Sequence, residues 1–318
     1  MEYQDPRPLD AWAHEYWSGR PIVKQLGGED LDSVLARQVA LDQHRHGTRA
    51  RLARSIRGVR HLQFPDRERL EGPRLVFSGD GRNTYSRELQ SVRWSDFVGS
   101  HPVRDYSRRR GQKNKPIAFY SRTMSDLVNC ESRLERAFAL LADFNPDIVH
   151  IAAQPCAIQF PPGDEMRVHT VDFVVLALGR IPLAVDVKTP EAAADAKWIA
   201  RHERVRRILA EAGIGHVVWT GLERTVIENL AYFAASRVPT AMYDHVRDRA
   251  ISWSFGGITA GQLAVQLAPY VGDTPGANGR TPQPVSIALV LVRALLWEQA
   301  LSTDLSLPFT ANSRVVSR

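Results

Sequence analysis

The sequence is poor in cysteine and has no long apolar segment. Its 318 residues include only two cysteines, Cys130 and Cys156, which is too few for a disulfide framework or for a zinc module built from cysteine pairs. The longest apolar runs, 173–178 and 287–292, are far shorter than the ~20 residues that cross a bilayer. The first residues also lack the basic and then apolar order of a secretion signal. These absences predict a cytoplasmic protein with no membrane partner.

The composition is that of a folded protein with a modest excess of positive charge. Hydrophobic residues make up 44% of the chain and charged residues 24%, which provides enough apolar surface for a core. Lysine and arginine (41) outnumber aspartate and glutamate (35), so the formal net charge is +6. This excess permits a polyanionic partner such as nucleic acid but does not identify one. A chain of this length is expected to form two or three domains.

The first third of the chain is Arg-rich and shows little periodicity. One apolar stripe predicts a helix over 30–43, and a basic link follows over 101–115. The basic residues of this link and the arginines in 49–60 could contact phosphates, and a solvated charged face is the alternative explanation for such runs. We predict an N-terminal extension of unknown role over 1–100, followed by an α/β domain over 101–238.

Helices and strands alternate through the predicted α/β domain. Ser132 and Glu135 form the S-x-x-E pattern of a capping box, which predicts the start of a helix over 132–141. A long strand is expected over 168–178, and the Gly-Arg turn after it predicts a hairpin partner over 181–188. The other expected elements are strands over 148–153, 157–160 and 216–220 and helices over 192–212 and 225–235.

The pattern changes in the last part of the chain, over 239–318. Two amphipathic helices, 259–267 and 285–300, are joined by a loop rich in glycine and proline. Two short extended pieces follow, around Leu305 and 314–316. This outline predicts a winged-helix-like C-terminal domain. The second helix is apolar enough either to be core or to bind a partner, and the sequence leaves both readings open.

The chemistry of the sequence is concentrated in the predicted hairpin. Side chains alternate along a strand, so Asp186 and Lys188 share one face, roughly 7 Å apart. The hairpin would set Asp172 beside them, and such an acidic pair suits Mg²⁺, which prefers oxygen ligands. A solvated strand edge is the simpler alternative. Glu135 is as well explained by helix capping as by metal binding, and His169 is expected to be a packed or hydrogen-bonded histidine.

These residues resemble a known family. Glu135, Asp172 and the Asp186-x-Lys188 pair, in the order helix, strand and hairpin, resemble the PD-(D/E)xK restriction-endonuclease-like nucleases, and more closely the TnsA-like endonuclease subunits of heteromeric transposases. The resemblance covers about 101–238 and, more loosely, 250–318. It is carried by the stretches Arg110–Asn114, Glu131–Arg136, Asp143–Val149, Ala153–Pro155, His169–Phe173 and Val185–Lys188.

The resemblance implies a fold and a metal site. The fold would be α/β, with a restriction-endonuclease-like core of a mixed sheet flanked by helices. Asp172, Asp186 and the carbonyl of Val187 would bind Mg²⁺, for which Mn²⁺ could substitute, and Glu135 would reach a second ion. Lys188 would hold or deprotonate the attacking water. The chain departs from the family at Val171, which replaces the name-giving proline, and at Asp186, where relatives often carry Glu or Gln.

The resemblance also implies partners. The leading hypothesis is an endonuclease that hydrolyses one strand of double-stranded DNA at transposon ends, together with a DDE-type transposase and an AAA+ ATPase regulator. The first alternative is a stand-alone restriction or repair endonuclease. The second is a non-catalytic DNA-binding assembly protein that keeps the fold. Neither the DNA sequence recognised, nor the cut position, nor the oligomeric state follows from the sequence.

Overall fold

The structure is a computed structural model, and its chain divides into two compact units. One spans Asp10–Gly221 and the other includes Leu222–Arg318. No helix in the part of the chain that the structure describes is long and apolar enough to cross a membrane. The described residues are 25–41, 62–104, 117–236, 243–271 and 283–318, with residues 13, 16–18, 20, 22–23 and 241.

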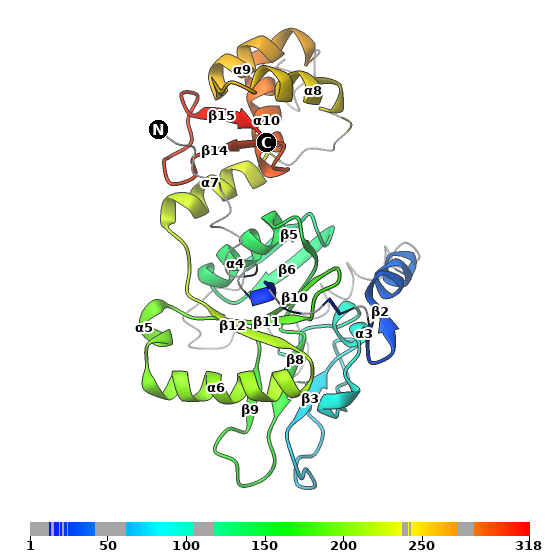
Figure 1. Ribbon diagram of the computed structural model, residues 1–318. Helices are drawn as coiled ribbons and strands as arrows, with labels where there is room; N and C mark the ends of the chain where they lie inside the picture. Colours follow the sequence, from blue (N-terminus) through cyan, green and yellow to red (C-terminus); the bar gives the residue numbers. More distant parts are fainter. Residues whose placement is uncertain are drawn as a thin grey trace. The chain divides into compact units, whose positions relative to one another are not determined.

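The first unit is built on a mixed four-stranded sheet. Its strand order is β12-β11-β10-β7; β10 is antiparallel to both of its neighbours, and β11 is parallel to β12. The helices α4 and α6 lie on opposite sides of this sheet (Figure 1). The elements are α4 (Arg133–Phe144), β7 (Ile148–Ala153), β10 (Phe173–Ala177), β11 (Leu183–Val187), α5 (Pro190–Ala193), α6 (Ala196–Glu211) and β12 (Gly215–Trp219).

A second four-stranded sheet, antiparallel throughout, has the order β4-β3-β8-β9. Two hairpins, β1–β2 and β5–β6, complete the strands described in this unit. A helix covers 31–41, close to the 30–43 that was predicted. The remaining elements are β1 (Gln25–Leu26), β2 (Glu29–Asp30), β3 (Arg74–Phe77), β4 (Tyr85–Arg87), η3 (Leu89–Ser91), α3 (Trp94–Val98), β5 (Ile117–Ser121), β6 (Asp126–Cys130), β8 (Cys156–Gln159) and β9 (Val168–Thr170).

The single long strand predicted over 168–178 is wrong. The chain forms two strands, because β9 pairs with β8 in the second sheet and β10 pairs with β7 in the first. The neighbouring strands β7 and β8 change sheets in the same way at Gln154, whose backbone is left-handed (φ 46°). The two crossings are tied together, since Gln154 N donates to Asp172 O at 2.9 Å. Asp172 is therefore placed at a junction between the two sheets.

Helix α4 forms where its capping pattern predicted. Ser132 Oγ accepts a hydrogen bond from Glu135 N at 3.0 Å, and the helix ends at Asn145. Its apolar face packs on the sheet through Phe138, whose ring centroid lies 5.0 Å from that of Phe173 and 5.5 Å from that of Trp219. This contact fixes the start of α4 relative to the strands that carry the predicted site.

The single helix predicted over 192–212 is divided into α5 and α6. Asp195 separates them and caps α6 by accepting hydrogen bonds from the backbone of Lys197 and Trp198. The buried face of α6 includes Val205 and Leu209, which belong to a core shared with the second sheet. Polar and charged side chains occupy its other face, as expected for a surface helix.

The second unit contains helices and a small antiparallel sheet of order β13-β15-β14. Helix α8 was not predicted, and the first extended piece lies at 301–303 rather than around Leu305. The apolar helix α10 is core, with Leu291, Val292 and Leu295 buried. The elements are α7 (Arg224–Ala234), α8 (Asp244–Trp253), β13 (Ile258–Thr259), α9 (Ala260–Leu267), η5 (Ala268–Tyr270), α10 (Pro284–Trp297), β14 (Leu301–Thr303) and β15 (Arg314–Ser317).

Candidate functional site

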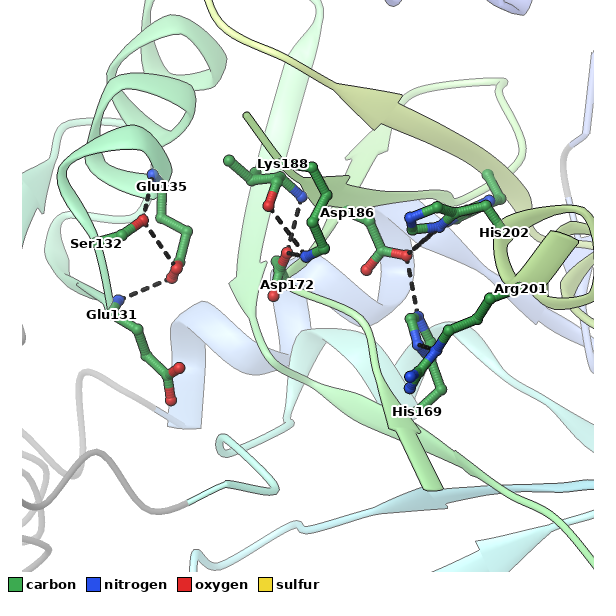
Figure 2. A network of polar contacts seen from close by, with 11 residues as sticks. Glu131, Ser132, Glu135, His169, Asp172, Asp186, Lys188, Arg201 and His202 are labelled. Atoms are coloured by element: carbon green, nitrogen blue, oxygen red, sulfur yellow. Dashed lines mark hydrogen bonds and ion pairs between the residues drawn. The ribbon is translucent and has the colours of Figure 1, made fainter. Parts of the chain in front are cut away.

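Asp172 and Lys188 meet at the end of the β10–β11 hairpin. The register pairs Phe173 with Val185, so Asp172 lies opposite Asp186, as the sequence predicted. Asp172 Oδ2 accepts hydrogen bonds from Val187 N at 2.7 Å and from Lys188 Nζ at 3.1 Å (Figure 2). The same ammonium donates to the carbonyl oxygen of Val187 at 3.0 Å. The positive charge of Lys188 thus lies between two oxygens that were predicted to bind metal.

Asp186 has different neighbours, because its carboxylate lies among histidines from three other elements. Asp186 Oδ2 is 2.9 Å from His169 Nε2 on β9 and 3.0 Å from His216 Nε2 on β12. Nδ1 of His202, on α6, is 3.1 Å from the same oxygen. The other carboxylate oxygen, Oδ1, is buried without a hydrogen-bond partner. Figure 2 shows Asp186 between the Asp172–Lys188 pair and the histidines.

Glu135 closes on the start of its own helix. Its carboxylate accepts hydrogen bonds from Glu131 N at 2.7 Å and from Ser132 Oγ at 3.0 Å (Figure 2). Within the described part of the chain, no hydrogen bond or ion pair joins Glu135 to Asp172, Asp186 or Lys188. Both Glu135 oxygens are engaged in the cap, so this side chain would have to leave the cap before it could bind a cation.

The surroundings of the three carboxyl groups shift their pKa values differently. Burial raises the pKa of Asp172, and the charge of Asp186 adds to this, against the opposing effect of Lys188. Burial would also raise the pKa of Asp186, but the adjoining imidazoles, His169 first, outweigh it and hold that pKa well below its usual range. Burial, followed by the charge of Asp172, raises the pKa of Glu135 to about 7 despite the cap hydrogen bonds.

Helix α6 supplies cations and an aromatic ring beside the hairpin. Lys188 Nζ lies 5.4 Å from the centroid of the Trp198 ring, and the guanidinium of Arg201 lies 5.1 Å from it. Arg201 Nε also donates to His169 Nδ1 at 3.3 Å, and Arg204 pairs with Asp164. These contacts attach α6 to the segment that leads into β9.

Sequence reasoning identified His169 as a hydrogen-bonded histidine, which is confirmed, but it did not find His202 or His216. A signal was present for each. His202 precedes Val205 and Leu209 by three and seven positions, which places it on the apolar face of α6. His216 lies inside a strand that was predicted to be buried. A histidine on a buried face needs polar partners, and this requirement could have drawn attention to both.

The basic stretch 49–60 and residues 105–115 of the predicted basic link 101–115 lie outside the described residues. Arg104, just before the second stretch, pairs with Glu131 at 3.5 Å. Comparison with known proteins adds no assignment, since no protein-family model and no curated protein matches the chain. The function must therefore be argued from the geometry of the hairpin and its surroundings.

Proposed function

We propose that the chain is a metal-dependent DNA endonuclease with a restriction-endonuclease-like core and a winged-helix-like C-terminal domain. We further propose that it is the subunit of a heteromeric transposase that cuts one strand at each transposon end. The observation that carries the proposal is the end of the β10–β11 hairpin. Two carboxylates and an ammonium are gathered there, where the two central strands of the first sheet begin and end, with Lys188 bonded to both Asp172 and the Val187 carbonyl.

The order of elements supports the proposed folds. In the first unit a mixed sheet is flanked by a helix on each side, and the central hairpin carries the acid-acid-lysine set. In the second unit the order is α8, β13, α9, α10, β14 and β15, with the three strands in one sheet. Helix, strand, two helices and a closing hairpin are the parts of a winged helix-turn-helix domain.

The donor set fits a hard divalent cation such as Mg²⁺. A positive charge already lies between Asp172 Oδ2 and Val187 O, which marks a position suited to a cation. Asp186 adds a buried carboxylate oxygen that has no hydrogen-bond partner. We propose that Asp172, Asp186 and the Val187 carbonyl hold the ion, and that Glu135, once released from its cap, contributes to a second position. A bound Mg²⁺ would supply a nucleophilic water at neutral pH and neutralise charge on the phosphate.

The protein's own groups would then orient the substrate and handle its charge. Lys188 would exchange its bond to Val187 for one to a phosphate oxygen or to the attacking water, because it is a flexible donor of three hydrogen bonds. Binding of a cation would favour the ionised form of Asp172, against the burial that raises its pKa. The excess of positive charge on the chain favours its approach to DNA.

The test is cleavage of transposon-end DNA by the full chain with Mg²⁺, with and without the neighbouring transposase. We expect single-strand cuts that depend on the transposase and are lost in Asp172→Ala and Lys188→Ala. Asp147→Ala is the matched control, because Asp147 is exposed and lies away from the hairpin in sequence. Specific cutting without the transposase would favour a stand-alone endonuclease. A protein that binds DNA but cuts none, even beside the transposase, would contradict the nuclease proposal.

A further inference from the structure

The histidines around Asp186 form a second cluster that the proposed nuclease chemistry does not use. Asp186 is 0% exposed, His216 4% and His202 7%. The two imidazoles are stacked, with ring centroids 5.6 Å apart and ring planes 24° apart. A carboxylate and nitrogen donors that are this deeply buried need a compensating interaction, because desolvation of polar groups is costly.

Hydrogen bonding alone accounts poorly for the arrangement. Three imidazole nitrogens approach Asp186 Oδ2, at 2.9, 3.0 and 3.1 Å, although a carboxylate oxygen has only two lone pairs. Asp186 Oδ1, by contrast, has no hydrogen-bond partner. His202 Nδ1 is close to Asp186 Oδ2 but lacks the geometry of a hydrogen bond, and His202 Nε2 has no partner, although both nitrogens are buried. The donors are crowded around one point while other polar atoms are left unsatisfied, as expected where a cation belongs.

His169 has a different role from the other two histidines. Arg201 Nε donates to His169 Nδ1, so this nitrogen offers its lone pair. In the neutral ring the proton is then on Nε2, and His169 donates to Asp186. It therefore orients the carboxylate, as the outer partners of metal ligands commonly do. His202 Nδ1 and His216 Nε2, which also face Asp186 Oδ2, could then offer lone pairs to an ion placed among the three atoms.

We propose that Asp186, His202 and His216 bind a transition-metal ion of the zinc class. Their donor atoms all lie within 4.8 Å of one another. The separations of 3.0 and 3.1 Å between Asp186 Oδ2 and the two nitrogens are close to the ~3.3 Å edge of a tetrahedron with zinc–nitrogen bonds of about 2.05 Å. Imidazole nitrogens favour zinc, copper, iron or nickel over magnesium. The ligands come from three elements, so the ion would tie β11, β12 and α6 together.

A cavity lies beside two of the three residues. His202 and His216 line a cavity of about 610 Å³, together with Val218, Thr220 and Glu203. An ion that enters this cavity would meet the two imidazole side chains first, because Asp186 lies behind them and is fully buried. Three protein ligands leave a fourth position for water or another small ligand, as in open zinc sites.

This proposal does not depend on the nuclease function, although the two share Asp186. Full-length protein without an affinity tag would be treated with a chelator and then titrated with Co²⁺. Binding would be followed by visible absorption, because the absorption of Co²⁺ depends on its coordination geometry. We expect one Co²⁺ per chain in a site containing nitrogen ligands, displaced by Zn²⁺ but not by millimolar Mg²⁺. Absence of cobalt binding to the wild-type protein would overturn the proposal.

Substitutions distinguish the proposed metal ligands from the residues that only contact them. His202→Phe keeps a ring stacked between Trp198 and His216 but removes the nitrogens, so it should fold and lose cobalt binding. His216→Asn is the second ligand variant. His169→Ala should weaken binding by about 10- to 100-fold. Circular dichroism would establish that each variant is folded. Equal cobalt binding by wild type and folded His202→Phe would refute the assignment.

Two further variants separate this site from the proposed nuclease site. Asp172→Asn and Lys188→Ala should keep cobalt binding, because neither residue is among the three donors. If cobalt binds as expected and Mg²⁺-dependent cleavage is absent, the metal site stands and the nuclease proposal fails. If cleavage is present and cobalt binding is absent, the metal site is wrong and the nuclease proposal stands.

Discussion

Glu135→Gln should stabilise the protein at alkaline pH in the absence of divalent metal. The folded state raises the pKa of Glu135 from 4.5 to about 7, so between these values the folded protein holds a proton that the unfolded chain has lost. Stability therefore decreases as pH rises through this range and is constant above it. The difference between these two pKa values corresponds to about 3 kcal/mol. Glutamine resembles the protonated acid and does not ionise, so the variant should not lose this stability as the pH rises.

The measurement is urea unfolding of both proteins in a chelator at pH 4 and pH 8. We expect similar free energies of unfolding at pH 4 and an advantage for Glu135→Gln of up to ~3 kcal/mol at pH 8. Thr259→Ala is the control, because it removes a helix cap whose side-chain partner, Gln262, carries no charge, and it should cost ~1 kcal/mol at both pH values. If the difference between Glu135→Gln and wild type were the same at both pH values, the argument from burial and charge would be refuted. Added Mg²⁺ should stabilise wild type more than Glu135→Gln if Glu135 contributes to a cation position.

Three other perturbations test separate parts of the structure. Asp172→Asn should abolish Mg²⁺-dependent cutting, and residual cutting would contradict the proposed metal site. In chelator its melting temperature should be unchanged or higher, because the substitution relieves repulsion with Asp186. Asn229→Ala removes side-chain hydrogen bonds to the backbone of Leu305, Leu307 and Phe309 and should destabilise the second unit by about 2–4 kcal/mol, measured by hydrogen exchange. Truncation after 221 should preserve binding of Co²⁺ but weaken transposase-dependent cutting, and normal cutting would rule out a docking role for the second unit.

Features set by neighbouring residues were predictable from the sequence. Helix α4 begins at a local signal, Ser132 followed by Glu135, and its apolar face repeats with the helical period. The β10–β11 hairpin is also local, since a tight turn joins two apolar strands. The proximity of Asp172 to Lys188 followed from that hairpin, so half of the candidate site could be argued before any tertiary contact was known.

Features that depend on pairing with distant segments were not predictable. The apolar run 168–178 looks like one strand, yet it divides at Asp172, because its two halves pair with different sheets. The residues of this segment do not indicate which strand each half pairs with. The division of the predicted helix 192–212 had a local signal in Asp195, an N-cap residue, but continuous helical periodicity on both sides concealed it.

The surroundings of Asp186 were decided by tertiary structure alone. Periodicity could place His202 on a buried helix face and His216 in a buried strand, but it could not show that both approach the same carboxylate as His169. Their convergence requires β9, β12 and α6 to pack around β11. The sequence determined which side chains face inward, because alternation and helical period are local properties. Only the packed fold determined which of those inward side chains meet.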